Sequence, residues 1–510
     1  MILHILKKDV RHLWGPIALT LVLLAVLARE DRWRMDWMPG LNEGWLNLLL
    51  PLAWATLTAL VIQEEALTGD RQFWITRPYR RGKLLAAKAL FLLLCIHAPA
   101  MIADGYIVAG RGFSPLKYLP QLLTKQMLLA GALVLPAAAL AALTRNLVQF
   151  LLGAIAIPVG VLFFASSMRA PFSRPSEQHT REALAIIAIG TVGGVVLLLR
   201  YLARRPVLSR ALAAAGALVG AAILIFAPPE FSAVARAALS HPPGSPVIRL
   251  VQRDSDVDLQ SSWYMPNMVT AALPITIESI PDGSRIRVEP LTLTVLAAAS
   301  DRYAMPARIP YRPFEKIPVM AYFQALEGRK PWLMLRLDRA VYARLESSPV
   351  RVYGRAMVSF YRRGETTWMP VGSTESAPEV GRCTAMEIED YSGGGLKVVC
   401  ESPAGVPRFT AVRLTSQADG REWRGRWLGD ASVSVPGPRQ AWLSPVERQD
   451  AFFRASERDW KAPGGQWLIP RTLIGSLKIG VTPDIDTGYA VVDYDLTDVP
   501  LSRFVLPPRQ

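Results

Sequence analysis

Long apolar runs dominate the first 227 residues, and they constrain the fold more than any other feature. A helix that crosses a bilayer needs about 20 mostly apolar residues. Up to Ala227 the sequence consists mainly of Leu, Ala, Val and Ile runs, whereas charges, prolines and short alternating stretches become frequent after Pro228. We therefore predict an α-helical polytopic membrane domain over residues 1–227, followed by a polar region over 228–510.

Seven of the runs fit a membrane-crossing helix, so we expect about six or seven spans. The first run is short, and the others are long and nearly free of charge. Residues 1–28 combine a basic start with this first apolar run, but no small-x-small cleavage site follows them. This favours a retained first helix over a signal peptide. The runs cover residues 14–28, 45–63, 85–109, 122–143, 147–166, 183–202 and 208–227.

The basic residues predict an orientation. Residues 1–227 hold 23 Lys and Arg against 11 Asp and Glu, whereas residues 228–510 hold 34 against 31. Cytoplasmic loops of membrane proteins are rich in Lys and Arg. A cytoplasmic N-terminus places 14 of the 23 basic residues inside and nine outside. With seven spans the C-terminal region is then extracytoplasmic, and we expect a multi-pass protein of the cell (inner) membrane.

Basic excess can also indicate nucleic-acid binding. Here the excess is concentrated in the apolar half, and the sequence contains no basic-aromatic module for reading bases. We therefore expect the lipid bilayer, and no nucleic acid, as the partner of these charges.

Two short stretches in this half carry polar residues of interest. Residues 1–13 alternate apolar and basic residues near helical spacing, which fits either an amphipathic helix in the interface or a cytoplasmic extension of the first span. His97 and Asp104 are seven residues apart in the third run and so share a helix face. Ionisable groups inside a membrane suggest function, so this pair is a candidate intramembrane polar site.

The segment 64–83, between the second and third runs, differs from the other loops. Two acids are followed by a glycine, by the aromatic pair Phe73 and Trp74, and by a basic turn that contains Pro78. Bulky aromatic side chains are costly to expose on a short loop, which suggests docking against a protein or the membrane surface. For the basic residues of the segment taken alone, a solvated anchor at the lipid headgroups is the favoured interpretation.

This segment resembles the cytoplasmic coupling region of ABC-2 type transporter permeases. Glu65 and Gly69 match the acid-to-glycine spacing of that family, Pro78 matches its turn, and Leu84, Leu85 and Lys88 match the Leu-rich re-entry into the membrane. The resemblance covers about residues 1–205. A seventh span and a large C-terminal region depart from the six-span pattern.

The resemblance implies a membrane subunit that does not itself hydrolyse ATP. A separate ABC ATPase subunit would carry ATP and Mg²⁺ and grip the loop, and a second permease chain would complete the transporter as a homodimer or heterodimer. The chain itself has no phosphate-binding Gly-x-x-x-x-Gly-Lys-Ser/Thr loop, so we expect no cofactor in it. The implied docking residues are Glu65, Gly69, Phe73, Trp74, Thr76, Arg77 and Pro78.

The C-terminal region shows short alternating runs separated by turn signals, which predicts an all-β, sandwich-like extracytoplasmic domain. A Gly-, Ser- and Pro-containing break divides it into a first part, 228–365, and a second part, 366–510. Cys383 and Cys400 flank a glycine-rich turn, so we expect a disulfide in an oxidising compartment, with two unrelated thiols as the alternative. With His241 as its one histidine, the region offers no His-based catalytic triad and no His cluster for zinc.

Two hypotheses follow from these patterns. In the first, the chain is a transporter subunit whose outer domain contacts substrate or an extracytoplasmic protein. In the second, the chain is a membrane-anchored extracytoplasmic binding or scaffold protein without transport activity. An enzyme is the least favoured class, because the apolar runs lack clustered His, Asp, Glu or Cys.

Overall fold

The computed structural model covers the whole chain and describes most of it. Nothing is stated about the placement of the remaining residues, which are 34–42, 65–80, 168–174, 204, 227–228, 252–267, 298–301, 305–318, 325–331, 378–379, 389–394, 404–407, 419, 426–444, 457–468 and 507–510.

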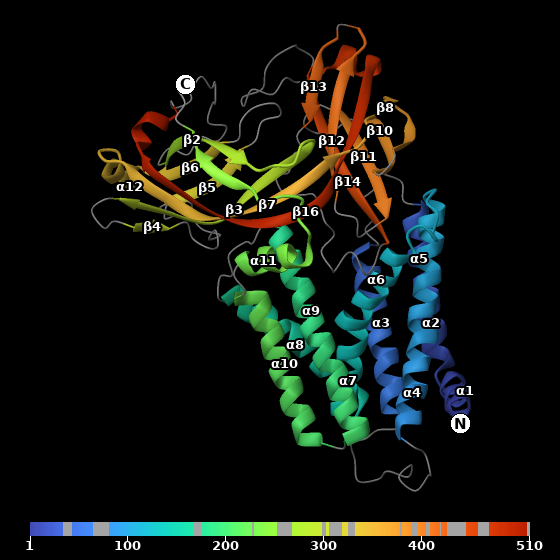
Figure 1. The fold of residues 1–510 in the computed structure, drawn as a ribbon. Helices are drawn as coiled ribbons and strands as arrows, with labels where there is room; N and C mark the ends of the chain where they lie inside the picture. The colour runs from blue at the N-terminus through green and yellow to red at the C-terminus, as the bar shows by residue number, and fades with distance from the viewer. Residues whose placement is uncertain are drawn as a thin grey trace.

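Helices make up the N-terminal region and lie side by side, as Figure 1 shows. In chain order they are α1 (Ile2–His12), α2 (Trp14–Trp33), α3 (Glu43–Gln63), α4 (Arg81–Leu92), η2 (Leu93–His97), α5 (Ala98–Gly110), α6 (Leu119–Leu129), η3 (Ala130–Val134), α7 (Leu135–Leu143), α8 (Leu147–Ser167), α9 (Pro175–Leu198), η4 (Leu199–Ala203), α10 (Pro206–Phe226) and α11 (Pro229–Leu239).

Every predicted span coincides with a helix, but fewer helices than predicted meet the length and hydropathy required of a span. Within the described residues four qualify, and the bent pair α1–α2 makes up to five. The qualifying helices are Arg81–Gly110, Leu119–Leu143, Glu182–Ala203 and Pro206–Leu224. The expected six or seven is therefore not reached. The difference lies in α3 and α8, whose described portions, Leu48–Gln63 and Leu147–Ile157, are apolar but short.

Three of the described long helices contain a widened π-helical turn, namely η2, η3 and η4, and the first two are followed closely by a proline. In η2 the Ala98 N–H donates to the Leu93 carbonyl, and in η3 the Leu135 N–H donates to the Ala130 carbonyl, both five residues back. A proline is the second residue after η2 and after η3, at Pro99 and Pro136. Proline has no N–H and its ring clashes with a carbonyl of the preceding turn, which accounts for the widening.

Helix α1 does not continue straight into the membrane. Its axis meets that of α2 at 74°, with Leu13 between them. Ile5 and Leu13 are buried in the hydrophobic core of the helical region, and α1 packs mainly against α4. Of the two interpretations of residues 1–13, the bend favours a helix that lies across the end of the helical region.

The C-terminal region is built mainly of strands, with the short helix α12 (Arg339–Leu345) among them. The strands are β1 (Val247–Leu250), β2 (Met268–Glu278), β3 (Ser284–Ala297), β4 (Arg302–Ala304), β5 (Val319–Gln324), β6 (Trp332–Asp338), β7 (Val350–Arg363), β8 (Thr367–Pro370), β9 (Thr374–Ala377), β10 (Gly381–Ile388), β11 (Gly395–Pro403), β12 (Arg408–Ser416), β13 (Glu422–Gly425), β14 (Val446–Ser456), β15 (Ile469–Pro470) and β16 (Leu477–Val499).

Among the described residues these strands form three sheets, antiparallel except where β14 meets β15. Their orders are β1-β2-β6-β5, β15-β14-β11-β10-β9 and β13-β12-β16-β7-β3-β4, with β8 also paired to β16. The third sheet contributes to two hydrophobic cores. Its β3–β7 end packs with the four-stranded sheet, and its β12 end packs with the five-stranded sheet.

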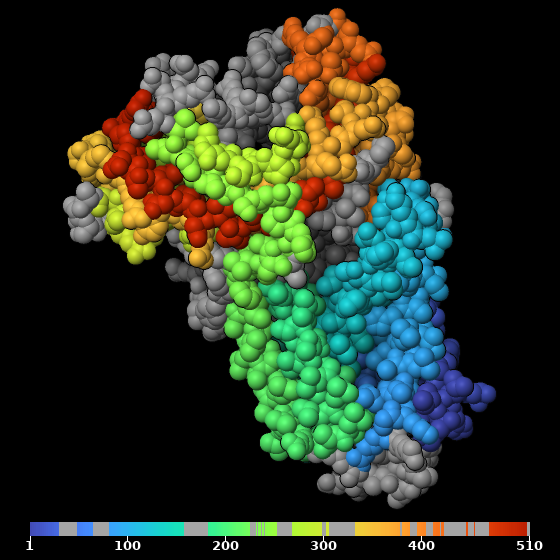
Figure 2. All heavy atoms as spheres, in the orientation of Figure 1, coloured from blue at the N-terminus to red at the C-terminus, as the bar shows by residue number. Residues whose placement is uncertain are grey.

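The two regions meet at one end of the helices. In Figure 1 the N-terminus lies at the end of the helical region farthest from the sheets, and Figure 2 shows the β region seated on the opposite end. Helix α11 lies at the junction, where it packs against β3 and β16.

Candidate functional site

A buried polar chain connects α5 and α6 inside the helical region. Lys125 Nζ donates to Asp104 Oδ1 at 2.5 Å, and Gln126 Nε2 donates to Asp104 Oδ2 at 3.1 Å. Gln126 Oε1 faces His97 Nδ1 at 3.1 Å. Because the amide nitrogen is committed to the carboxylate, its oxygen meets the imidazole, and the proton of His97 sits on Nδ1. The chain thus runs from His97 through Gln126 and Asp104 to Lys125.

The cost of burying charge explains why these groups occur together. An isolated carboxylate or ammonium is expensive to place in a membrane helix, and such groups pair with one another in the interior of a bundle. Asp104 and Lys125 are almost fully buried, with side chains 4% and 8% exposed. Their opposite charges cancel within the ion pair, which makes burial of both groups tolerable. The π-helical turn that ends at His97 directs the imidazole toward α6.

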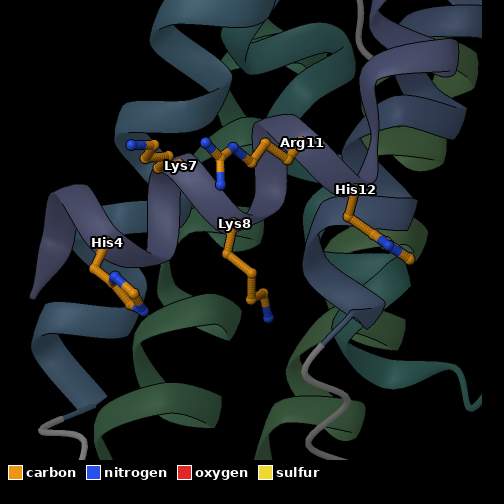
Figure 3. Close-up of a pocket in the computed structure, with 5 residues that line it drawn as sticks. All are labelled: His4, Lys7, Lys8, Arg11 and His12. Atoms are coloured by element: carbon orange, nitrogen blue, oxygen red, sulfur yellow. The ribbon is translucent and has the colours of Figure 1, made fainter.

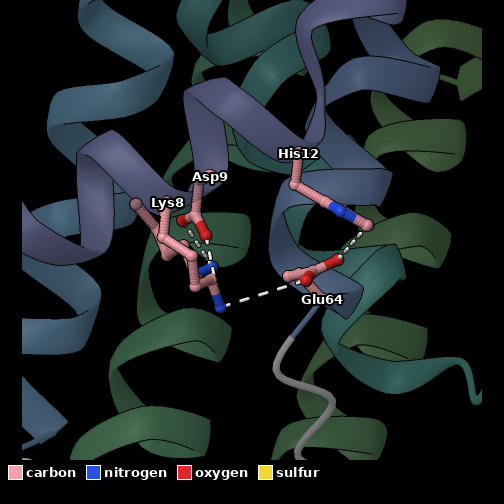
Figure 4. A network of polar contacts seen from close by, with 5 residues as sticks. Lys8, Asp9, His12 and Glu64 are labelled. Carbon is pink, nitrogen blue, oxygen red and sulfur yellow. Dashed lines mark hydrogen bonds and ion pairs between the residues drawn. The ribbon is translucent and has the colours of Figure 1, made fainter.

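A second charged cluster lies at the end of the helices that carries the N-terminus (Figure 4). Asp9 of α1 is fully buried, and its Oδ2 accepts from Lys88 Nζ of α4 at 2.9 Å. Lys8 Nζ lies 3.5 Å from Asp9 Oδ1 and 3.9 Å from Glu64 Oε1. The other Glu64 oxygen lies 3.4 Å from His12 Nε2. We call these five residues the α1 charge cluster.

Helices α4, η2 and α5 form one continuous rod, Arg81–Gly110, and the end of this rod opposite Lys88 contacts the β region. Arg111, directly after α5, donates through Nη1 to Glu401 Oε1 and Oε2 of β11, at 2.8 and 2.9 Å. Both side chains are only 12–13% exposed. Gly381 of β10, with φ of +115°, lies against the Glu401 backbone so closely that a Cβ would collide with its carbonyl. A glycine is therefore required where β10 passes Glu401.

Next to Glu401, the two cysteines of the β region lie directly opposite each other. Cys383 of β10 pairs in register with Cys400 of β11, and the two are joined by a disulfide. Both side chains are buried in the core beneath the five-stranded sheet. Cys95, in the helical region, is a free thiol.

The structure describes some of the residues that were singled out from the sequence and leaves others out. Glu65, Gly69, Phe73, Trp74, Thr76, Arg77 and Pro78 lie outside the described residues. His97 and Asp104 come together through a residue of another helix. Lys88 was named from the sequence only for the re-entry into the membrane, and its contact with Asp9 was not predicted. Gln126, Lys125, Asp9 and the Arg111–Glu401 pair were not found from the sequence, although the charges of Asp9 and Lys125 in or beside apolar runs were a usable signal.

Comparison with known proteins finds no family model that matches this sequence and no similar curated protein. The fold alone therefore defines the class. The long apolar helices mark a membrane protein, and a β-rich region follows them in the chain.

Proposed function

We propose that this chain is the membrane-spanning permease subunit of an ATP-driven transporter. Its cytoplasmic segment 64–83 would be driven by a separate ABC ATPase subunit that carries ATP and Mg²⁺. A second permease chain would complete the pathway, and the C-terminal β domain would contact substrate or a protein outside the membrane. The observation that carries the proposal is the α1 charge cluster, because it holds both flanks of this segment.

The cluster would transmit a displacement of this segment to the helices beside it. Glu64 directly precedes the undescribed residues 65–80, and Lys88 follows them by two turns of α4. Their contacts with Lys8, His12 and Asp9 tie α3 and α4 to α1. A displacement of the segment between them would therefore be passed to three helices together.

The rod formed by α4, η2 and α5 gives that motion a path. Its 30 residues, Arg81–Gly110, extend about 45 Å at 1.5 Å per residue. Lys88 is held near one end, and Arg111 grips Glu401 of the β region just beyond the other. His97 and Asp104 lie between these two contacts, and their polar chain joins the rod to α6, one of its neighbours in the bundle.

The topology we propose is seven crossings with the β domain extracytoplasmic. The four qualifying helices, the bent pair and the two shorter apolar helices supply that number. An odd number suits the placement of the N-terminus and the β region at opposite ends of the helices (Figure 1). A disulfide within the β region is also typical of an oxidising compartment.

Co-purification of the intact protein from its own cells tests the proposal. The wild type should bring down an ATPase that contains a phosphate-binding loop. Replacing Phe73 and Trp74 together by Ala should abolish this association, whereas Trp368→Ala, an exposed aromatic of β8, is the matched control and should retain it. If no ATPase accompanies the wild type, or if the Phe73/Trp74 variant still retains it, the transporter hypothesis is wrong.

One observation favours the second candidate, a membrane-anchored binding or scaffold protein. The β region builds two separate hydrophobic cores, so it has a fold of its own to present. This candidate predicts that the intact protein retains an extracytoplasmic partner when Phe73 and Trp74 are replaced and that no ATPase accompanies it.

A further inference from the structure

A cavity lined by basic side chains lies on helix α1. Its volume is about 450 Å³, and the described residues that line it are His4, Lys7, Lys8, Arg11 and His12. Figure 3 shows that all five project from successive turns of this one helix. The cavity is separate from the polar chain of α5 and α6, and only its Lys8 and His12 take part in the α1 charge cluster.

The position of α1 places this cavity at the level of lipid headgroups. The helix is set at 74° to the membrane helix α2. Leu3 of α1 and Trp14, the first residue of α2, are each 72% exposed, and Val10 of α1 is also exposed, so apolar side chains point outward beside the basic ones of α1. A basic amphipathic helix with this composition lies in the interface, and Trp is enriched at the headgroup level.

The charges that line the cavity favour a phosphate group as its occupant. Lys7 and Arg11 are exposed and four residues apart, so they share one face of the helix. Like charges at this spacing repel each other, and an anion between them removes the repulsion. The Arg guanidinium offers a planar fork of donors to phosphate oxygens, and the Lys ammonium adds a point charge.

We propose that this cavity binds the phosphodiester headgroup of an anionic phospholipid in the leaflet that α1 contacts. The site rests on the membrane placement of α1 and not on the transporter function. A lipid is favoured over a soluble anion because the exposed Leu3, Val10 and Trp14 provide an apolar surface for acyl chains beside the charged cavity. A bound headgroup would hold α1 in the plane of the interface while Asp9 keeps it fastened to α4.

Native mass spectrometry of the purified full-length protein tests this binding. Phosphatidylglycerol and phosphatidylcholine are titrated separately into the wild type and into the Lys7→Gln/Arg11→Gln variant. The control variant, Arg145→Gln/Arg205→Gln, removes two exposed basic residues elsewhere in the helical region. A basic side chain near an anionic headgroup strengthens binding about fivefold, so loss of two should weaken phosphatidylglycerol binding about 25-fold.

Four results decide the matter. The site is supported if the Lys7→Gln/Arg11→Gln variant binds phosphatidylglycerol more weakly while its phosphatidylcholine binding is unchanged. The control variant should then bind like the wild type, and the charge-preserving variant Lys7→Arg/Arg11→Lys should bind phosphatidylglycerol normally. Equal weakening in both neutralised variants would show general surface attraction and overturn it. Binding of inorganic phosphate as tight as that of the lipid would reassign the site to a soluble anion. Unchanged lipid binding, with loss of a co-purifying protein, would reassign it to protein docking.

Discussion

Replacing Lys88 by Met is the sharpest test of the α1 charge cluster. The Lys88 side chain is 1% exposed and its ammonium lies 2.9 Å from the carboxylate of Asp9, which is fully buried. Methionine preserves most of the volume and all of the apolar stem but removes the charge. The variant therefore isolates the consequence of leaving the Asp9 carboxylate in place without its buried partner.

The expected loss of stability follows from the burial of both groups. Breaking a buried ion pair by removing one member costs about 3–5 kcal/mol. Lys8, whose side chain is 41% exposed, remains 3.5 Å from the other Asp9 oxygen and offsets part of this cost. We therefore expect about 3 kcal/mol, the low end of that range. For a region of about 200 residues this corresponds to a fall in Tm of about 6–12 °C.

In the assay the protein is heated in a mild detergent to a series of temperatures. The monodisperse fraction that remains at each temperature is then measured by size-exclusion chromatography, which gives Tm. Lys83→Met, an exposed position on the same helix, is the matched control and should leave Tm near that of the wild type. The double variant Asp9→Leu/Lys88→Met should recover most of the loss, because apolar residues of similar volume can replace a buried pair at little cost. A wild-type Tm for Lys88→Met, or a double variant less stable than the single one, would refute the reasoning.

Three further predictions concern the β region and the thiols. Glu401→Gln should weaken the charged contact with Arg111 and speed amide hydrogen exchange at the end of α5, while exchange in α12 stays constant. Burial raises the pKa of Tyr361 well above its usual value. The unfolded chain then ionises first, so folding stability should hold below about pH 10 and fall above it, and Tyr361→Phe should reduce that fall. In denaturant without reductant an alkylating reagent should label one thiol per chain, Cys95, and label three after reduction; labelling of all three beforehand would contradict the disulfide.

Local patterns in the sequence located the helices and many of the strands. Apolar runs depend only on neighbouring residues, so each predicted span coincides with a helix, from residues 14–28 to residues 208–227. Strands β10 and β11, which carry Cys383 and Cys400, are likewise close in the sequence, and they pair with each other. Fewer helices qualify as spans than the sequence predicted, because the described apolar portions of α3 and α8, Leu48–Gln63 and Leu147–Ile157, are shorter than a span.

The polar contacts between distant residues could not be derived in the same way. Asp9 and Lys88 are 79 residues apart, and Arg111 and Glu401 are 290 apart. No periodicity links such positions, because their meeting depends on how whole helices and sheets pack. The role of Gln126 shows the same limit, since an amide in an apolar run gives no sign that it joins His97 to Asp104.

Strand β16 has a consequence for how the β region can be divided. This 23-residue strand pairs with β12 along its first half and with β7 along its second, and its side chains enter both hydrophobic cores. A fragment that stops before Leu477 would leave β7 and β12 without their common neighbour. Severing the chain near residue 366 would yield two pieces that each lack half of a continuous layer, so we expect the region to unfold as one cooperative unit and to resist expression in halves.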